Sequence, residues 1–356
     1  MEHKLSASLA ILFGRVLLKG LTHIMAIESA GYIKFPNVSE PPFEMDSEID
    51  DIWGRKWGCD SDVGKLRTVL MYPPTRDILK DPGKKLVTST ESADERDQGW
   101  YWDGDECMPR NQLPIEKMRG QWDGLISILE ANEVDIVRMQ SVTGGRFSHY
   151  TRDSAIAVKG GAIICRLRPY TRRGEEVYAT KTIATLGMPI IRTITGRGML
   201  EGGSFTWLDS QTVIVGRSNC VNEEAVVQLE EILNPQGIEV LRADLSFFDI
   251  HIDGVFGMLN HGIAMVDKDK LPFIFLEELQ KRGITLIPIT KDDDPWVLNS
   301  LVLEPGKVVM PEGLSAVTRK RLDHHQIEVI TIPFDQVQLN GGGIRCSTCP
   351  LIRDFI

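Results

Sequence analysis

The chain has 356 residues, of which 42% are hydrophobic and 25% are charged, and its formal net charge is -10. This is an ordinary globular composition, and the length allows a large core in one or two domains. The acidic balance argues against a protein that binds the phosphate backbone of nucleic acids, and it is compatible with a small cationic partner.

The cysteines and the N-terminus bear on the compartment. Six cysteines in so long a chain are too sparse for a disulfide scaffold, and no apolar run is long enough to cross a membrane, so we expect a cytoplasmic protein. The N-terminal stretch LSASLAILFGRVLLKGLTHIMA is apolar, but Arg15 and Lys19 interrupt it, which argues against a secretory signal. We interpret it as a docked helix, or as an upstream extension with the true start at Met25. A peripheral membrane helix or a targeting peptide is the alternative.

A short strand recurs after each helical stretch at intervals of roughly 43 to 54 residues, which is typical of a repeat architecture. The five strands are VDIVRM from Val134, MPIIRTI from Met188, GIEVLRA from Gly237, GITLIPI from Gly283 and QIEVITI from Gln326. LRTVLMYPP from Leu66 opens the first unit. The stretches between are amphipathic, as in NEEAVVQLEEIL, where Asn222 is a plausible N-cap, and in LPFIFLEELQKRG, where Gly283 ends the helix.

Four of the units also carry two apolar runs around a turn, as a hairpin requires. The expected turns are Gly160-Gly161, Asp209-Ser210, His261-Gly262 and Pro305-Gly306. Each unit is therefore strand, strand, helix, strand, and such units can bury their strands only against their neighbours. The sequence predicts an α/β fold in which five ββαβ units close into a pseudo-fivefold propeller around a central channel. An ordinary mixed α/β sandwich is the alternative.

Reactive side chains fall at the same phase of four units. Asp153 in YTRDSAIAV, Glu201 in LEGGSF, and His251 with Asp253 in HIDGVF each come just before an expected strand, and Cys346 follows three glycines in GGGIRC. If HID were extended, His251 and Asp253 would share one face while Ile252 turned into the core. In a closed ring this phase points to one place. The sequence thus predicts a cluster suited to nucleophilic chemistry on a cation.

These segments, with DSDVGKLRTVLMYPP, resemble in order the motifs of the guanidine-modifying enzymes. That superfamily comprises arginine deiminases, dimethylarginine hydrolases and amidinotransferases and has the five-bladed pentein fold. The resemblance covers roughly Trp57 to Ile352. It implies a pentein catalytic domain over residues 57–356, preceded by an N-terminal extension over residues 1–56.

The resemblance also implies roles for the clustered residues. Asp153 and Asp253 would grip the edges of a guanidinium, Glu201 would bind that group or steer His251, Cys346 would attack the carbon, and His251 would transfer protons. Nearby carboxylates would keep the resting thiol protonated, and an arriving guanidinium would favour the thiolate. No cofactor and no metal is implied.

Cys346 and Cys349 form a Cys-x-x-Cys pair with other readings. A redox pair would open a helix in a smaller βαβ setting, and a structural zinc site needs four ligands, whereas the sequence has no second such pair. Cys349 is either a small hydrophobe or a modulator of Cys346 oxidation.

The choice of reaction rests on fewer residues. Dimethylarginine hydrolases lack an aspartate two residues after the histidine, so Asp253 favours a deiminase-like hydrolase that releases ammonia through a covalent thiouronium intermediate. An amidinotransferase, in which HID also occurs, is the alternative. A pentein binding module that is not an enzyme would lack the catalytic set. A metal-dependent hydrolase needs more histidine ligands than the chain supplies.

Two departures from the family pattern bear on the substrate. Ser204 stands where Asp often follows EGG, and Cys220 stands where deiminases and dimethylarginine hydrolases have the arginine that holds the α-carboxylate of arginine. Arg217, Arg172 or Arg173 would have to take over that contact. Otherwise the substrate is a guanidine or amidine other than arginine.

Three further expectations concern the segment around Trp100, the pair Asp60 and Asp62, and the binding partners. The aromatic and acidic segment WYWDGDECMPRNQLP around Trp100 would make either a lid over a cationic ligand or a surface loop. Asp60 and Asp62 would reach the mouth of the channel. We expect a homo-oligomer that binds a small guanidino substrate. We expect no nucleic acid partner, and no contact with a membrane unless the N-terminal extension binds one.

Overall fold

The computed structural model describes residues 39–79, 100–103, 106–140, 145–168, 172–246 and 249–356. The chain divides into two units, Met1–Pro42 and Phe43–Ile356, and the fold below is that of the second. The predicted boundary between residues 56 and 57 stays a prediction.

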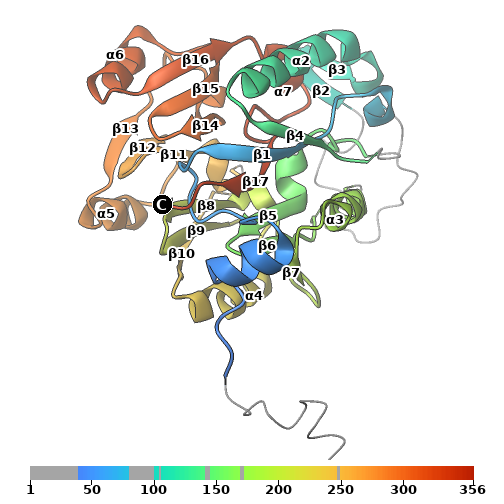
Figure 1. Ribbon diagram of the computed structural model, residues 1–356. Helices are drawn as coiled ribbons and strands as arrows, with labels where there is room; N and C mark the ends of the chain where they lie inside the picture. The colour runs from blue at the N-terminus through green and yellow to red at the C-terminus, as the bar shows by residue number, and fades with distance from the viewer. Residues whose placement is uncertain (1–38, 80–99, 104–105, 141–144, 169–171, 247–248) are drawn as a thin grey trace, which may run out of the picture. The chain divides into compact units, whose positions relative to one another are not determined.

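Five three-stranded sheets, here called blades, make up the described part of this unit. Each blade has two antiparallel strands, then a helix, then a third strand parallel to its neighbour. In Figure 1 helices α2 to α6 lie at the periphery and the sheets lie inside. The predicted pseudo-fivefold α/β propeller is confirmed.

The blades follow one another along the chain. Blade 1 holds β17 (Cys349–Arg353), β1 (Leu66–Met71), α2 (Ile115–Ala131) and β4 (Asp135–Arg138). Blade 2 holds β5 (Ala155–Val158), β6 (Gly161–Ile164), α3 (Glu175–Leu186) and β7 (Ile190–Thr193). Blade 3 holds β8 (Phe205–Asp209), β9 (Thr212–Arg217), α4 (Glu223–Leu233) and β10 (Glu239–Asp244). Blade 4 holds β11 (Phe256–Asn260), β12 (Ile263–Val266), α5 (Phe273–Lys281) and β13 (Thr285–Pro288). Blade 5 holds β14 (Leu301–Glu304), β15 (Lys307–Pro311), α6 (Ala316–His324) and β16 (Glu328–Ile332).

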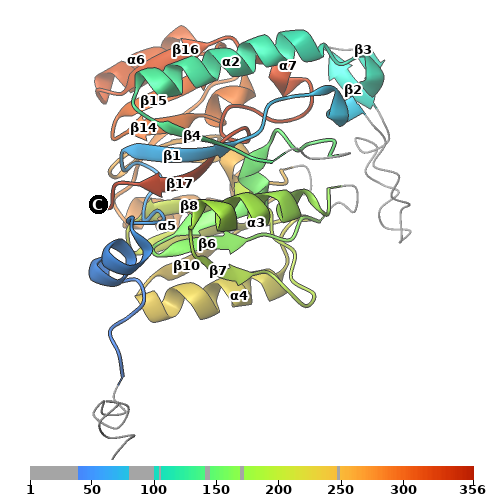
Figure 2. The same ribbon diagram turned by 45° about the vertical axis from the view of Figure 1, so that its right-hand side comes forward.

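Blade 1 is built from both ends of the propeller. Its first strand is β17, the last strand of the chain, which pairs antiparallel with β1 in a register that joins Leu66 to Arg353 and Leu70 to Cys349. The sequence analysis found β1 but gave blade 1 no hairpin. The structure supplies the missing strand from the C-terminus and so closes the ring, as Figures 1 and 2 show by the red strand beside the blue one.

Local sequence explains the helix ends and the turns. The Asn222 side chain accepts a hydrogen bond from Ala225 N and caps α4, and Gly283 takes φ +76° just after α5, as predicted. The four hairpins are also confirmed. Two turns lie one residue from their predicted places, at Lys159-Gly160 and at Ser210-Gln211, since β6 starts at Gly161 and β8 ends at Asp209.

Two further elements lie outside the five sheets, one inserted in blade 1 between β1 and α2 and one after blade 5. The hairpin of β2 (Trp100–Asp103) and β3 (Glu106–Pro109) is joined to α2 by a short 3₁₀ turn, and α7 (Asp335–Gln338) follows β16. The predicted lid around Trp100 falls on this hairpin and partly outside the described residues, so it stays a prediction.

Apolar side chains between neighbouring blades form the core. One cluster joins blades 1 and 2, one joins 2 and 3, one joins 4 and 5 with part of 3, and one joins 1 and 5 around the buried Trp122. Each blade therefore buries its strands against its neighbours, as the repeat pattern required.

A buried ion pair joins the two ends of the chain that build blade 1, and its hydrogen bonds link them to β8 of blade 3. Asp62 lies just before β1 and accepts hydrogen bonds from Arg345 Nη2 (2.7 Å), from Trp207 N (3.1 Å) and from the Thr206 hydroxyl. Burial alone would raise the pKa of Asp62, but Arg345, Arg152 and the Thr206 hydroxyl outweigh it and hold that pKa below its usual range. Asp62 is thus a buried structural acceptor.

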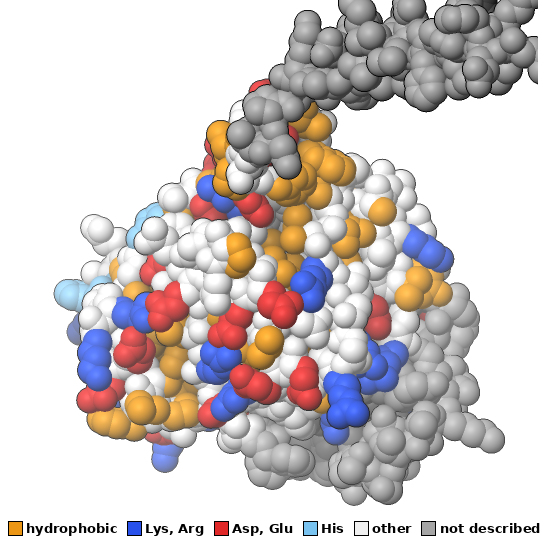
Figure 3. Space-filling view, turned by 90° about the horizontal axis from the view of Figure 1, so that it is seen from below, with side chains coloured by type: hydrophobic (Ala, Val, Ile, Leu, Met, Phe, Trp, Pro, Cys, Tyr) orange, Lys and Arg blue, Asp and Glu red, His pale blue; other side chains and the backbone are white. Residues whose placement is uncertain are grey.

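Surface ion pairs are a different case. Figure 3 shows acidic and basic side chains mixed over the face that is seen from below. Arg67 and Asp354 form a two-bond pair at 2.8 and 2.6 Å, but both side chains are more than one-third exposed. Solvent screens such pairs, so each contributes at most about 1 kcal/mol.

We predict that Asp62→Ala lowers the free energy of unfolding by about 3–5 kcal/mol, because it leaves the buried Arg345 without its partner. The matched control is Asp354→Ala, which removes an exposed carboxylate from an arginine pair and should cost about 1 kcal/mol or less. Urea unfolding of the two variants and the parent measures both values. Equal losses in the two variants would contradict the structural role given to Asp62.

Candidate active site

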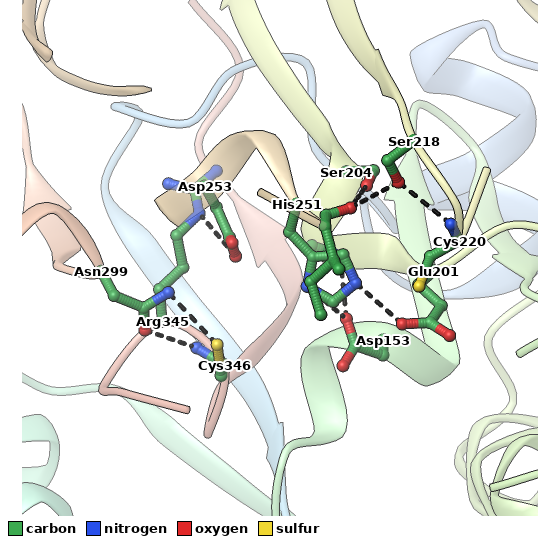
Figure 4. A network of polar contacts seen from close by, with 12 residues as sticks. Asp153, Glu201, Ser204, Ser218, Cys220, His251, Asp253, Asn299, Arg345 and Cys346 are labelled. Atoms are coloured by element: carbon green, nitrogen blue, oxygen red, sulfur yellow. Dashed lines mark hydrogen bonds and ion pairs between the residues drawn. The ribbon is translucent and has the colours of Figure 1, made fainter. Parts of the chain in front are cut away.

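Short turns at the start of each blade present the predicted residues. Asp153 lies in the 3₁₀ turn Thr151–Ser154 before β5, and Glu201 is the N-cap of the turn Gly202–Ser204 before β8. His251 is the N-cap of the turn Ile252–Gly254, which contains Asp253 and leads toward β11. Cys346 lies in the turn before β17. All five side chains are buried, and Figure 4 shows Cys346 and Asp253 on one side and His251 with Asp153 on the other.

The conformation of HID differs from the one expected. His251 has extended backbone angles, but Ile252–Gly254 forms a 3₁₀ turn and β11 begins only at Phe256. Ile252 is buried in the core, as predicted, while His251 and Asp253 both lie at the centre. The extended conformation expected for HID is therefore wrong. The turn, not a strand, presents the two side chains.

His251 lies between two carboxylates. Its Nε2 is 2.8 Å from Glu201 Oε2, and its Nδ1 is 3.7 Å from Asp153 Oδ1. Burial would lower the pKa of His251, but Asp153, Cys220 and Glu201 outweigh it and hold that pKa well above its usual value. These neighbours therefore favour the imidazolium form of the ring.

The glycines of EGG are required by this packing. A Cβ at Gly203 would lie 2.6 Å from His251 Nδ1 and 3.0 Å from Asp153 Oδ1, and a Cβ at Gly202 would collide with the Arg152 carbonyl. Gly203 N also donates to Asp153 Oδ1 at 3.1 Å. The backbone of blade 3 thus approaches the reactive side chains of blades 2 and 4 directly, which only glycine allows.

Asn299 holds Cys346 and was missed by the sequence analysis. Its Nδ2 donates to Cys346 Sγ at 3.2 Å, and its Oδ1 accepts from Cys346 N at 3.1 Å. Asn299 ends the 3₁₀ turn Pro295–Leu298 before β14, so it lies at the phase of blade 5 that corresponds to Asp153, Glu201 and Asp253. That repeat phase is the signal that could have identified it.

The surroundings of Cys346 favour the protonated thiol. Burial, Asp253 and Asp153 raise the pKa of Cys346 to about 12, and His251 opposes them only in part. The direction agrees with the expectation from the sequence. A cation placed among these carboxylates would reverse it.

Asp253 keeps an open acceptor. Its Oδ2 is buried and makes no hydrogen bond within the described part of the chain, and the nearest cation is Arg345, with Nε at 3.7 Å. Burial raises the pKa of Asp253 although His251 and Arg345 oppose it. A buried carboxylate oxygen without a partner is costly, so this atom is suited to a donor from a ligand.

Arg172 lies inside the cluster, where its guanidinium binds the carboxylates. Its Nη1 donates to Asp153 Oδ2 at 2.8 Å and lies 3.7 Å from Glu201 Oε2, and its Nε and Nη2 donate to Glu175. Burial would lower the pKa of Arg172, but Glu175, Asp153 and Glu201 raise it well above its usual value. A role in binding substrate stays a prediction for Arg172, and it would require these bonds to change.

The other predicted residues lie elsewhere. The Arg217 guanidinium binds Asp244 and Glu223, whose side chains are half exposed or more. Arg173 donates from Nε to the Leu167 carbonyl. Asp60 accepts from the backbone N–H of Ile356, and burial raises its pKa to about 6. None of these contacts joins Arg217, Arg173 or Asp60 to the cluster.

Two cysteines near the cluster make separate contacts. Cys349 Sγ donates to the Ala155 carbonyl at 3.3 Å at the start of β17. Cys220 lies beside His251, and its ligand atom and those of Glu201 and His251 are all within 4.8 Å of one another. Among the described residues, these three side chains are close enough together to hold a metal ion. No helix among the described residues is both long and apolar enough to span a bilayer.

Fold and cluster together define a pentein of the guanidine-modifying superfamily. The family model of the eukaryotic N,N dimethylarginine dimethylhydrolases matches residues 106–353, and the chain belongs to that family. Its fold is that of DDAH from Pseudomonas aeruginosa complexed with citrulline, with a TM-score of 0.66 at 19% identity over 81% of this chain and 100% of that one.

Two curated relatives are also similar. The uncharacterized protein YkgA of Bacillus subtilis is 24% identical over 83% of this chain and 95% of its own length. An arginine deiminase of Oenococcus oeni is 24% identical over 58% of this chain, and the match covers 61% of the length of that enzyme. The Asp253 argument placed this chain nearer the deiminases, whereas the family model carries the name of the dimethylarginine hydrolases. The comparisons therefore establish the family.

We predict that iodoacetamide alkylates Cys346 slowly at neutral pH, and that the rate rises about tenfold for each pH unit up to pH 10 without a plateau. Only the thiolate reacts, and the raised pKa keeps its fraction small over this range. Mass spectrometry of the alkylated peptide measures the rate at each pH. A plateau near pH 8.5, where an ordinary cysteine titrates, would contradict the electrostatics described above.

We further predict that Asn299→Leu slows alkylation of Cys346 at a fixed pH by about tenfold or more, because a hydrogen bond to a charged sulfur stabilises the thiolate by about 1.5–3 kcal/mol. The control is Asn340→Leu, which removes an amide bound to the Arg146 carbonyl near the same turn but not to the sulfur. If both variants react at the parent rate, Asn299 does not stabilise the thiolate.

Proposed function

We propose that the protein hydrolyses a C–N bond of a guanidino compound by covalent catalysis through Cys346. The observation that carries the proposal is the convergence of a thiol, an imidazolium bound to a carboxylate, and two further carboxylates from separate blades. Such a set supplies a nucleophile, a proton donor and anionic ligands for a planar cation. Membership of the dimethylarginine dimethylhydrolase family supports the same chemistry.

Binding comes first in the proposed mechanism. The open Oδ2 of Asp253 accepts one N–H of the guanidinium, and Asp153 accepts another on the opposite edge. Charge-assisted hydrogen bonds of this kind fix the plane of the group and leave its carbon exposed to Cys346. Asp153 must then share or exchange its bond to Arg172.

Bond formation and cleavage follow. Cys346 releases its proton to solvent as the guanidinium binds, and its sulfur attacks the guanidinium carbon to form a C–S bond. His251 gives its proton to the departing nitrogen, the C–N bond breaks, and ammonia or an amine leaves. The product of this half-reaction is a thiouronium on Cys346.

Water completes the cycle. Neutral His251 takes a proton from water, the oxygen attacks the thiouronium carbon, and the C–S bond breaks to return the thiol and release a ureido product. If an amine attacks in place of water, the same intermediate gives amidino transfer. The residues of the cluster serve both outcomes, so the acceptor decides the reaction.

Activity on a panel of guanidines tests the proposal. We expect ammonia or an alkylamine from at least one of arginine, agmatine, guanidinobutyrate, guanidinoacetate and the methylated arginines, and we expect Cys346→Ala to lower its rate by about a thousandfold or more. Cys349→Ala is the matched control, because that thiol faces the Ala155 carbonyl, and it should keep most of the activity.

The outcomes separate the alternatives. A product amine without ammonia identifies a dialkylated or methylated guanidine as substrate, and ammonia identifies an unsubstituted terminal nitrogen. Turnover only when glycine or another amine is added would establish amidino transfer instead of hydrolysis. Turnover that survives Cys346→Ala would overturn the covalent mechanism.

A further inference from the structure

Three arginines are buried close to Asp62. Arg152 lies in the 3₁₀ turn before β5, Arg345 lies in the turn before β17, and Arg353 is the last residue of β17. Their exposed fractions are 8%, 3% and 3%. Each guanidinium acts on the pKa of Asp62, and the three also act on one another. The four charges therefore form one buried group.

The carboxylates of this group do not balance its arginines. Asp62 Oδ2 binds Arg345 Nη2 at 2.7 Å, and Asp253 Oδ2 is 3.7 Å from Arg345 Nε. Among the described residues, Nε and Nη2 of Arg152 and Nε of Arg353 have no hydrogen-bond partner although they are buried. The other two nitrogens of Arg353 donate to backbone carbonyls, which are neutral. Three guanidiniums thus share two carboxylates, and a buried charge without a counter-ion is costly.

A small cavity adjoins these charges. Its volume is about 20 Å³, and its wall includes Cys59, Asp62, Arg152 and Arg353 together with residues of β5, β8 and β17. All of the lining residues are buried. A cavity of this volume holds one particle of roughly the size of a water molecule, and a polyatomic anion such as sulfate is too large for it.

The pKa shifts of two lining residues agree with this placement. Burial raises the pKa of Cys59 to about 12, and Arg353 and Arg152 oppose that rise. Burial lowers the pKa of Arg353 to about 10, against Cys59 and Asp62, and repulsion from Arg152 and Arg345 adds to the fall. The cations at the wall therefore repel one another, and an anion beside them would relieve that repulsion.

We propose that this cavity binds one chloride ion next to Arg152 and Arg353, and that the chloride strengthens the binding of a cationic substrate at Asp253. A monatomic anion fits the volume, and guanidinium N–H groups form charge-assisted hydrogen bonds to anions. The carboxylate of the wall, Asp62, already has its Oδ2 bound by Arg345. A water molecule is the other occupant of suitable size, but it would leave the excess positive charge without a counter-ion.

The link to the substrate rests on the proposed function, whereas the binding of chloride does not. Arg152 and Gly202, which both line the cavity, belong to the turns that present Asp153 and Glu201. A guanidinium bound at Asp253 adds one positive charge to a group that already has an excess of cations. Chloride supplies one negative charge, and charges interact strongly in a buried region of low dielectric constant. Anion and substrate should therefore favour each other.

Bromide locates the anion directly, because it replaces chloride and scatters X-rays anomalously. Crystals of the full chain grown with about 100 mM sodium bromide should show an anomalous peak in the cavity, at hydrogen-bonding distance from guanidinium nitrogens of Arg152 and Arg353. This measurement uses the parent protein and depends on neither a variant nor an assay of turnover.

Thermal unfolding measures the same binding in solution. Replacing about 100 mM sodium gluconate by sodium chloride, at equal ionic strength, should raise the Tm by about 3 °C. Arg152→Gln should abolish this difference, because it removes one of the two cations. The matched control is Arg67→Gln, which removes an exposed arginine paired with Asp354 and should keep the difference. For any guanidine that is turned over, chloride should lower the KM by about threefold or more.

The outcomes decide separately on the site and on its link to the substrate. No anomalous peak in the cavity, with equal Tm in the two salts, would mean that water fills it and would overturn the proposal. A chloride effect on Tm that survives Arg152→Gln would also overturn it, and if that variant does not fold, the bromide peak decides alone. Bromide in the cavity with a KM independent of chloride would keep the site and refute the link. Bromide there in a protein that turns over no guanidine would count against the proposed function alone.

Discussion

The pairing of the last strand with the first positions the site. β17 and β1 lie at opposite ends of the propeller domain in the sequence, and their backbones are hydrogen-bonded to each other. The turn before β17 carries Cys346. Bonds on both sides fix that turn, because Arg152 N donates to the Cys346 carbonyl and Cys346 N donates to Asn299. The thiol therefore reaches the carboxylates of blades 2 and 4 only when the ring is closed. Folding and assembly of the nucleophilic centre are one event.

Closing the ring buries several carboxylates, and not all of them are paired closely with an arginine. Asp62 is bound by Arg345, and Asp153 and Glu175 share Arg172. Asp253 has only a distant contact with Arg345, and its Oδ2 lacks a hydrogen bond among the described residues. A buried acceptor left in this state costs free energy that a cation with N–H donors recovers on binding. The arrangement thus favours a guanidinium over a neutral ligand before any specific contact is considered.

Most of the fold could be predicted from the sequence because each blade repeats the same local signals. Caps such as Asn222, turn glycines such as Gly283 and hairpin alternation act over a few residues, so one sequence suffices to read them. The pairing of β17 with β1 has no local signal, since it joins segments at opposite ends of the domain. Asn299 was missed because an asparagine is not a usual catalytic residue, although its phase in the repeat matched that of Asp153. The ion pairs of Arg172 with three carboxylates, two of them hydrogen-bonded, could not be predicted from YTRRGEE.

Under the proposed function, the charge of Asp153 affects the pKa of both His251 and Cys346. Asp153, Cys220 and Glu201 raise the pKa of His251, and burial, Asp253 and Asp153 raise the pKa of Cys346. Asp153 is common to both. A guanidinium bound to Asp153 cancels its field at each group, which lowers the pKa of the thiol toward the thiolate and lowers the pKa of the imidazolium toward release of its proton. The substrate thereby activates nucleophile and acid together, and a ligand without the positive charge activates neither.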